Sequence, residues 1–376
     1  MATAGRLRWR GFQPDPFVGR LFAWGYNSSG ECGFGDRTQR SSPVQVGSAG
    51  DWKLGMAAGY SSLILRSGRA WGTGGYLPLG GPGFSTRSSP VQIGGAVDWT
   101  TLAGSTDFYY PSYGGIRSGK LFMWGNNRYG QLGDGTRTDR SSPVQVGAET
   151  DWTVLTAGKE ASLGIRGGML FAWGFNGYGI CGVASSTASF SSPVQIGALS
   201  DWTAISMGYY GVHALRAGKL YGWSFNGFGE LGNGTVDLSD HATPVQIGTF
   251  DDWTYLSHGN SCCFGIRKPG RLYAWGYNEG VGALGLGNLT NRSSPVQVGA
   301  AIDWSFIDIG IGTSYATAFG IRSGRLYAWG YDGNNWGMLG LGTSGTSRSS
   351  PVQVGAETDW LFARSGPYQS MGIRHT

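Results

Sequence analysis

The chain has 376 residues, of which 40% are hydrophobic, 14% aromatic and only 14% charged, and its formal net charge is +5. The aromatic content supplies enough surface for a large core, which excludes a disordered chain, and so small and dispersed a charge gives no indication of a nucleic-acid partner. No stretch approaches the run of about eighteen apolar residues that crosses a membrane, and the first ten residues lack the apolar segment of a secretory signal. We therefore expect neither membrane insertion nor secretion.

Residues 1–18 precede the first copy of a repeat that occupies residues 19–376. This N-terminal stretch contains Arg8, Trp9 and Arg10 and then two prolines. Two interpretations remain open for it: a loose chain end, or an arm that docks on a neighbouring subunit. We predict one arm, residues 1–18, and one repeat domain, residues 19–376.

The repeat is defined by Pro-Val-Gln-(Val/Ile)-Gly, three further residues and Asp-Trp. Its prolines are Pro43, Pro90, Pro143, Pro193, Pro244, Pro295 and Pro351, and each lies eight residues before the Asp of a pair that begins at Asp51, Asp98, Asp151, Asp201, Asp252, Asp303 or Asp359. Successive prolines are 47 to 56 residues apart. A period near fifty residues that is rich in Gly and Trp indicates a propeller or another repeat array.

Each repeat contains four short segments with strand character. The first carries a Trp, which we place at Trp24, Trp71, Trp124, Trp173, Trp223, Trp275 and Trp329. The Pro-Val-Gln segment, the Asp-Trp segment and a segment ending in Arg follow, and the last leads through a Gly-containing hairpin turn into the next Trp strand. Four antiparallel strands are the content of one propeller blade.

The two ends of the repeat domain complement each other. The chain begins its repeats with Gly19-Arg-Leu-Phe-Ala-Trp24 and finishes with Met371-Gly-Ile-Arg374-His-Thr. These are the two halves of the hairpin seen elsewhere. We predict an all-β, seven-bladed propeller of four-stranded antiparallel blades, closed by pairing of the N- and C-terminal strands, which would remove exposed sheet edges.

The repeat resembles that of the regulator of chromosome condensation family. The resemblance lies in the pattern Leu-(Phe/Tyr)-Ala-Trp-Gly-x-Asn-x-x-Gly-x-Leu-Gly followed by Pro-Val and Gly, and it covers essentially residues 19–376. It implies a seven-bladed β-propeller. The eponymous eukaryotic members imply a guanine-nucleotide exchange factor or a chromatin regulator.

Two charged residues recur in every repeat. One is the Asp of Asp-Trp, and the other is the Arg at Arg66, Arg117, Arg166, Arg216, Arg267, Arg322 and Arg374. A ligand-gripping ring of charges is one interpretation. The favoured one is a scaffold role, in which Asp caps a turn and Arg pairs with it or packs over Trp, because residues that repeat with the scaffold serve every blade. The same holds for Gln45 and its six counterparts.

Departures from the repeat are the candidate binding residues. An enlarged loop at 105–114 holds Phe108, Tyr109, Tyr110 and Tyr113, and an insertion in the seventh repeat holds Asn335 and Trp336. Aromatic clusters of this kind are typical of contact surfaces. Together with Arg8, Trp9 and Arg10, they form the predicted partner-binding set.

Catalytic and metal-binding motifs are not recognisable in the sequence. The four Cys and the four His form no Cys-x-x-Cys, His-x-x-x-His or Ser/His/Asp arrangement. We therefore expect no enzyme activity, no catalytic residue, no cofactor and no metal.

Near-identical repeats, low charge and few reactive groups favour a non-enzymatic structural or interaction protein. The leading hypothesis is a virion component assembled in the host cytoplasm, such as a phage tail, fibre or capsid-decoration subunit, that binds other structural proteins or its own copies. A carbohydrate-binding, lectin-like propeller that attaches to a surface glycan is the alternative. A guanine-nucleotide exchange factor or chromatin regulator is the lesser alternative.

Overall fold

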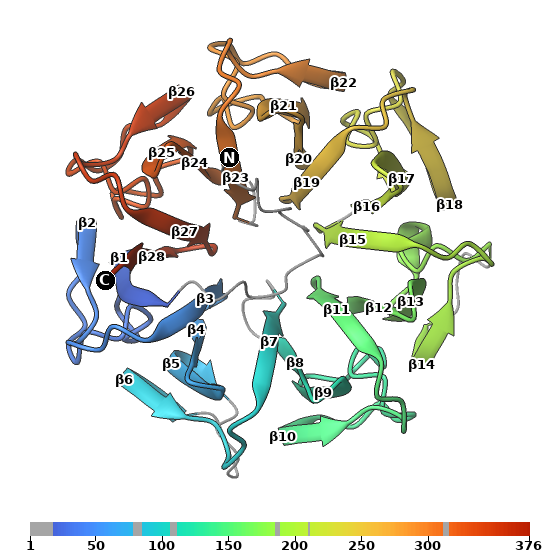
Figure 1. The fold of residues 1–376 in the computed structure, drawn as a ribbon, viewed down its shortest axis with the longest axis horizontal. Helices are drawn as coiled ribbons and strands as arrows, with labels where there is room; N and C mark the ends of the chain where they lie inside the picture. The colour runs from blue at the N-terminus through green and yellow to red at the C-terminus, as the bar shows by residue number, and fades with distance from the viewer. Residues whose placement is uncertain (1–17, 78–84, 106–110, 185–188, 210, 311–315) are drawn as a thin grey trace, which may run out of the picture.

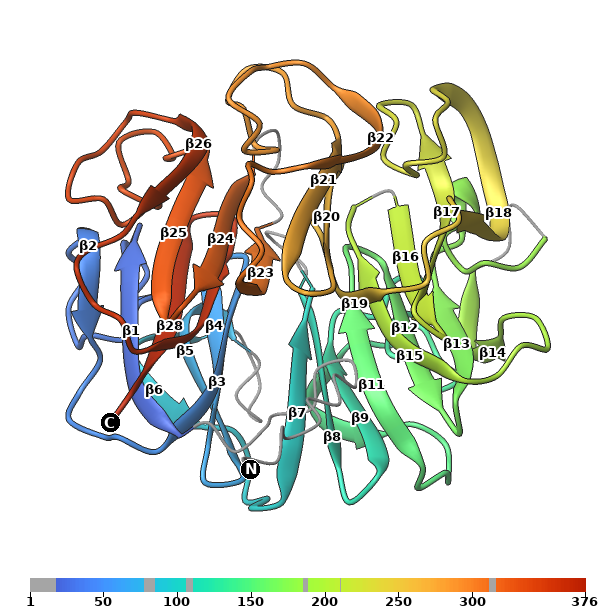
Figure 2. The same ribbon diagram turned by 45° about the horizontal axis from the view of Figure 1, so that its top comes forward.

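The computed structural model describes residues 18–77, 85–105, 111–184, 189–209, 211–310 and 316–376. Within these ranges the chain forms 28 strands and one short 3-10 helix, η1 (Gly177–Gly179). The strands stand in antiparallel groups of four around a common axis (Figure 1), and a tilted view shows the groups side by side around that axis (Figure 2). The fold is therefore an all-β propeller. No helix among the described residues has the length and apolar character needed to cross a membrane.

Each blade contains four kinds of strand. The innermost strand begins at the Trp of Asp-Trp: β3 (Trp52–Ala58), β7 (Trp99–Gly104), β11 (Trp152–Ala157), β15 (Trp202–Met207), β19 (Trp253–His258), β23 (Trp304–Ile309) and β27 (Trp360–Ser365). The second strand carries the recurrent Arg: β4 (Ser61–Arg66), β8 (Ser112–Arg117), β12 (Ala161–Arg166), β16 (Gly211–Arg216), β20 (Cys262–Arg267), β24 (Thr317–Arg322) and β28 (Gln369–His375).

The third and fourth strands form the outer half of each blade. The third strands are β5 (Arg69–Leu77), β9 (Lys120–Gly125), β13 (Met169–Gly174), β17 (Lys219–Asn226), β21 (Arg271–Gly276), β25 (Arg325–Gly330) and β1 (Gly19–Gly25). The fourth strands contain Pro-Val-Gln: β6 (Ser85–Gln92), β10 (Arg140–Gln145), β14 (Phe190–Gln195), β18 (Asp237–Ile247), β22 (Arg292–Gln297), β26 (Arg348–Gln353) and β2 (Arg40–Gln45).

The first and last strands of the described chain lie in the same blade. β1 pairs with β28 at seven consecutive positions, from Gly19 opposite His375 to Gly25 opposite Gln369. Five other blades are separate four-stranded sheets, while a single pairing of Gly19 with Trp52 links the β27-β28-β1-β2 group to the β3-β4-β5-β6 group. One blade is thus built from both ends of the repeat domain.

Tryptophans of the third strands hold neighbouring blades together. Six of these indoles are fully buried, and five of them donate a hydrogen bond of 2.8–3.0 Å to a loop carbonyl of the preceding blade: Trp24 to Met338, Trp173 to Gln131, Trp223 to Ile180, Trp275 to Glu230 and Trp329 to Ala283. A buried indole N–H needs such an acceptor. The repeated Trp is therefore a core residue.

The second blade departs from our strand assignment. Trp71 pairs with Gln92, as Phe171 pairs with Gln195 in a later blade, so Trp71 occupies the Phe171 position rather than that of a core Trp. Thr73 takes the Trp position and donates its hydroxyl to the carbonyl of Gly30. The sequence assignment was wrong here because a Trp-Gly pair occurs two residues before the bulge, whose glycine is the left-handed Gly74 (φ +96°).

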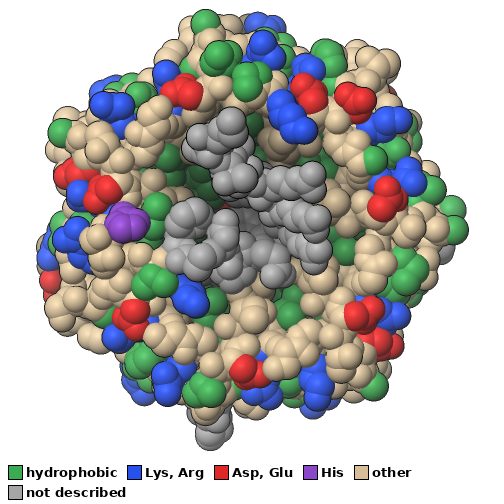
Figure 3. All heavy atoms as spheres, in the orientation of Figure 1, with side chains coloured by type: hydrophobic (Ala, Val, Ile, Leu, Met, Phe, Trp, Pro, Cys, Tyr) green, Lys and Arg blue, Asp and Glu red, His purple; other side chains and the backbone are tan. Residues whose placement is uncertain are grey.

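The scaffold role predicted for the recurrent Asp and Arg is confirmed. All seven pairs form ion pairs of 2.5–3.5 Å, and in six blades the guanidinium lies 5.3–5.7 Å from the ring centroid of the Asp-Trp tryptophan. Each equivalent of Gln45 donates its side-chain amide to a glycine carbonyl two residues on. In the view of Figure 3, basic and acidic side chains alternate around the rim instead of forming a patch of one sign.

Candidate functional site

The loops between the third and fourth strands are organised by one buried residue. It is Asn27, Asn127, Asn176, Asn226, Asn278 or Asp332, each at most 2% exposed. In every case its Oδ1 atom accepts a hydrogen bond of 2.8–3.2 Å from a backbone amide five to seven residues on. An irregular loop buried against a blade needs such a partner for its backbone.

Asn127 shows how the loop is held at both ends. Its Oδ1 atom accepts from the amide of Leu132 at 3.0 Å, and its Nδ2 atom donates to the carbonyls of Thr136 at 3.2 Å and Thr138 at 3.1 Å. One amide side chain thus joins three points of the loop. The consequence is a rigid mount for the residues that flank the Asn.

Aromatic residues flank this Asn and pair across blade boundaries. The ring centroids are 5.2 Å apart for Tyr129 and Phe175, 5.6 Å for Tyr178 and Phe225, 5.0 Å for Phe228 and Tyr277, and 5.3 Å for Tyr26 and Trp336. We call these eight residues the aromatic belt. Each pair joins the loop of one blade to the loop of the next, so the belt lies on the side of the propeller that carries these loops.

The belt keeps apolar surface open to solvent. Tyr178 is 43% exposed and Phe228 is 39% exposed, and the other six rings are partly buried. Arg128 extends the belt by placing its guanidinium 5.4 Å from the centroid of Tyr129. Rigid aromatic rings with exposed edges and a nearby Arg are the composition of a protein-binding surface.

One part of the predicted partner-binding set lies in this belt. Trp336 contacts Tyr26 and also Tyr368, whose centroid is 5.0 Å away, and Tyr368 stacks on Tyr60 at 4.9 Å. The neighbouring Asn335 is exposed in a left-handed conformation (φ +65°), and its carbonyl accepts from Gln39 at 3.1 Å. The insertion of the seventh repeat thus joins a surface that several blades share.

Tyr113 requires a correction. It is fully buried, shares a hydrogen bond of 2.7 Å with the hydroxyl of Ser61 and stacks on Trp124. It is a core residue because it replaces a small second-strand residue at a blade boundary. The remaining predicted positions, Arg8, Trp9, Arg10, Phe108, Tyr109 and Tyr110, lie outside the described residues.

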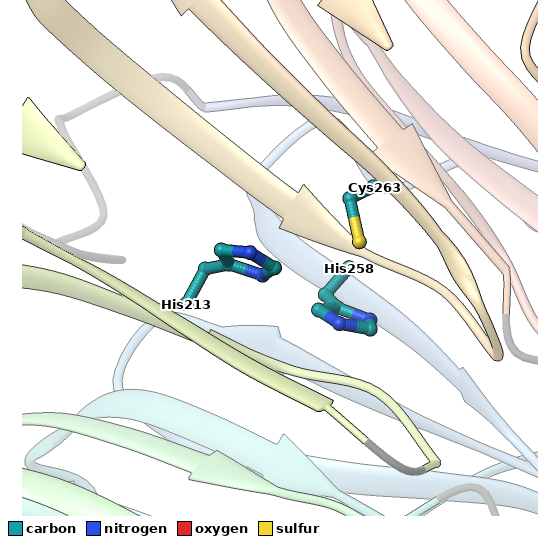
Figure 4. A group of neighbouring side chains, drawn as sticks. All are labelled: His213, His258 and Cys263. Atoms are coloured by element: carbon teal, nitrogen blue, oxygen red, sulfur yellow. The ribbon is translucent and has the colours of Figure 1, made fainter. Parts of the chain in front are cut away.

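A second group of side chains with chemical potential lies inside the protein. His213, His258 and Cys263 converge between the blade of β15–β18 and the blade of β19–β22 (Figure 4). Their potential ligand atoms lie within 4.8 Å of one another, and all three residues are buried. These residues form no short sequence motif, because they come from three different strands, β16, β19 and β20.

A signal for both groups was present in the repeat alignment. Seven of the eight belt aromatics stand one residue before or two residues after the loop Asn, as in Phe175 and Tyr178, while Trp336 lies four residues after Asp332. His213 lies three residues before the recurrent Arg216, where Leu63 and Leu163 precede the equivalent Arg. Comparing repeats position by position, rather than searching for motifs, would have shown both departures.

Comparisons with known proteins agree with this architecture. Residues 18–64, 118–165, 167–215 and 269–319, more than half of the chain, match the family described as Regulator of chromosome condensation (RCC1) repeat. Over 145 residues, 36% of this chain, the sequence is 32% identical to the Ultraviolet-B receptor UVR8 of Arabidopsis thaliana, and over 138 residues it is 31% identical to the probable E3 ubiquitin-protein ligase HERC3 of Homo sapiens. These matches span 32% of UVR8 and 12% of HERC3.

Solved structures show the same fold over the whole chain. Human WBSCR16 superposes with a TM-score of 0.80 at 19% identity, covering 95% of this chain and 99% of that one. Prp20p of Saccharomyces cerevisiae superposes with a TM-score of 0.79 at 20% identity, covering 98% of this chain and 94% of that one. At these identities the likeness concerns the fold.

The comparisons overturn the leading functional hypothesis. The relatives and fold neighbours named above are eukaryotic proteins, so the prediction of a virion component, and with it the virion location, is wrong. The predicted structural-assembly and glycan partners likewise find no support in them. Low charge and near-identical repeats misled the prediction because they follow from the propeller scaffold and carry no information about where the protein works.

Proposed function

The chain belongs to the regulator of chromosome condensation (RCC1) repeat family, and on that premise we propose that it is a non-catalytic interaction propeller whose protein partner docks on the aromatic belt. The observation that carries this proposal is the pairing of aromatic rings across successive blades, with Tyr178 and Phe228 left 43% and 39% exposed. Rings held by rigid loops lose little entropy on binding.

The class of partner is supported by what the fold neighbours bind. The Prp20p structure was described together with its binding to Gsp1p and histones, and another structure is of Kap60 bound to yeast RCC1 (Prp20). Those partners are proteins. We propose a protein partner here on the same grounds, with the belt rather than a pocket as the docking surface.

Two surface grooves support a non-catalytic role. One is lined by Pro43, Gly340 and Trp360, and the other by Pro351, Gly285 and Trp304. Each set contains the same three repeat positions at a different blade boundary. We therefore interpret these grooves as part of the repeated scaffold.

We also propose that the β1–β28 pairing closes a ring of seven blades. The seven paired positions that join the ends of the repeat domain support it. A closed ring is a stiff platform, because every blade has two neighbours and no sheet edge at a chain end is left open.

The test compares a double variant of the belt with a control variant at an exposed apolar residue outside it. Tyr178→Ser combined with Phe228→Ser removes the two most exposed belt rings, while Leu199→Ser removes an apolar side chain that is 47% exposed and lies in the turn before Asp201. Binding of each purified variant to Gsp1p, to histones and to Kap60 is measured by surface plasmon resonance. Proteins that co-purify with each variant from native extract are compared quantitatively.

We expect at least one protein to bind the wild type and the Leu199→Ser variant equally and the double variant at least tenfold more weakly, with unchanged melting temperatures. Equal binding by all three forms would show that the belt is not the docking surface. Turnover of a substrate by the wild type would contradict the non-catalytic role.

A further inference from the structure

Three buried side chains meet where the fifth and sixth blades pack together. His213 lies on β16, His258 ends β19 and Cys263 lies on β20 directly opposite His258 in the antiparallel register. The three residues are 1%, 3% and 1% exposed, and Figure 4 shows them facing a common space. Their potential ligand atoms lie within 4.8 Å of one another.

Backbone carbonyls fix the tautomer of both imidazoles. His213 Nε2 lies 3.1 Å from the carbonyl oxygen of Leu231, and His258 Nδ1 lies 2.8 Å from that of Gly259. A carbonyl oxygen can only accept, so each of these nitrogens carries the ring proton. The lone pairs are therefore left on His213 Nδ1 and His258 Nε2.

Those two lone pairs have no hydrogen-bond donor among the described residues. His213 Nδ1 and His258 Nε2 are both buried and unpartnered. An imidazole that donates one N–H to a carbonyl and directs its other nitrogen into a shared space has the arrangement of a metal-ligating His.

Cys263 and Glu230 bring a thiol and a carboxyl group to the same blade boundary. The Cys263 Sγ atom donates to the backbone carbonyl of Glu230 at 3.2 Å. The Glu230 carboxylate is fully buried; its Oε2 atom accepts from the amide of Phe228 at 2.7 Å, and its Oε1 atom has no hydrogen-bond partner. The same residue thus holds the thiol through its backbone carbonyl and carries a buried carboxylate oxygen without a partner.

Gly211 leaves open the space between Glu230 and His258. A Cβ atom at Gly211 would lie 2.6 Å from His258 Nε2 and 3.8 Å from Glu230 Cγ. The histidine and the carboxylate therefore approach the same point of β16, which only a residue without a side chain leaves free.

We propose that this cluster is a structural zinc site formed by His213 Nδ1, His258 Nε2 and Cys263 Sγ, with Glu230 Oε1 as the fourth ligand. Nitrogen, thiolate and carboxylate donors in a four-ligand set are those that zinc takes in proteins. A dication balances the charges of one thiolate and one carboxylate, so the buried site is neutral when filled. On binding, the thiol proton of Cys263 passes to solvent and its sulfur forms the bond to the metal.

Only small movements are needed to close the site. Zinc–ligand bonds of about 2.0–2.3 Å place tetrahedral ligand atoms roughly 3.4–3.8 Å apart. For His213, His258 and Cys263, whose ligand atoms lie within 4.8 Å of one another, side-chain movements of about an ångström therefore suffice. The bound ion would join the fifth blade, through His213 and Glu230, to the sixth, through His258 and Cys263.

The test uses substitutions that the protein itself carries in other blades. His213→Leu, His258→Ala and Cys263→Ser install the residues found at the equivalent positions Leu163, Ala157 and Ser162, so each variant is expected to fold. Cys262→Ser is the matched control, because the thiol of Cys262 points elsewhere and donates to the carbonyl of Tyr277 at 3.0 Å. Ser61 occupies the Cys262 position in another blade.

Zinc content is measured on the full chain by mass spectrometry of the metal, and affinity by competition with a chromophoric chelator. We expect one Zn²⁺ per chain in the wild type and in Cys262→Ser, and affinity lower by at least about 100-fold in the other three variants, since even outer partners of a zinc site change affinity 10- to 100-fold. Cobalt substituted into the wild type should show a thiolate charge-transfer band that Cys263→Ser lacks.

Two results would refute the proposed zinc site. One is wild-type protein that takes up no stoichiometric Zn²⁺ from a buffered zinc solution, including the case in which it takes up only Cu⁺. The other is Cys263→Ser or His258→Ala that binds Zn²⁺ as tightly as the wild type while its circular dichroism and melting temperature show a folded chain. Neither result bears on partner binding at the belt, so the two proposals fail separately.

Discussion

Replacing Asn127 with Ala tests whether the buried amide holds the loop that carries Tyr129. The substitution removes the acceptor of the Leu132 amide, which is fully buried, and an orphaned buried N–H costs about 1–3 kcal/mol. The carbonyls of Thr136 and Thr138 also lose a donor, which adds roughly 1 kcal/mol because water can reach them in part. We expect a total loss of about 3 kcal/mol in the free energy of unfolding.

Thermal unfolding gives the corresponding shift. An unfolding entropy of about 2.1 cal/mol/K per residue predicts, for 376 residues, a fall in melting temperature of about 4 °C. Asn334→Ala is the control, because Asn334 is exposed and its Oδ1 atom accepts only from the nearby Tyr331 hydroxyl. A shift for Asn127→Ala no larger than that of the control would refute the reasoning that the loop depends on this side chain.

Three further perturbations test the scaffold. Gly125→Ala should lower the free energy of unfolding by more than about 2 kcal/mol in denaturant melts, since Gly125 has φ +99° and an added Cβ would lie 2.4 Å from the Pro111 carbonyl oxygen. Gly47→Ala is the control and should cost only about 1 kcal/mol, because nothing lies within 4 Å of a Cβ at Gly47. Burial raises the pKa of Asp308 to about 7, although Arg364 opposes this, so the folded state binds its proton more tightly than the unfolded state. The stability that this proton contributes is present at low pH and is lost as the pH rises from about 4 through about 7. In urea melts, Asp308→Asn should reduce the fall in the free energy of unfolding over this pH range. A variant with the same pH profile of stability as the wild type would contradict the prediction. Deleting residues 366–376 removes β28, and we expect loss of folded monomer on size exclusion; a folded monomer with the wild-type melting temperature would argue against ring closure.

The parts of the fold that repeat could be predicted from the sequence. Asp51 and Arg66 have counterparts in all seven repeats, 15 residues apart in five repeats and 19 in the other two, and their pairing follows because each blade needs the same turn. Trp71 shows the limit of this reasoning. A Trp-Gly pair marks the third strand but does not fix its register, which depends on where the bulge glycine meets the neighbouring strand.

The belt and the histidine cluster were harder to foresee, because both are contacts between blades. Tyr129 and Phe175 are 46 residues apart, and their rings meet across a blade boundary. A motif search examines short stretches of sequence, so it cannot detect a site that is assembled from equivalent positions of successive repeats. Aligning the repeats by strand register would bring such positions together.

The two histidines illustrate what a departure from a repeat can mean. His213 stands where other blades have Leu63, Leu163 or Phe264, and His258 stands where others have Met207 or Ile309. Putting an unpartnered polar atom at an apolar core position costs about 1–3 kcal/mol, and here that happens twice. If the two substitutions were independent and merely tolerated, nothing would require them to meet. They face each other across one blade boundary, with ring centroids 5.1 Å apart, and a thiol and a buried carboxylate accompany them. A bound cation would satisfy both nitrogens, the thiolate and the carboxylate at once, which explains why the two departures from the apolar pattern, His213 and His258, occur together.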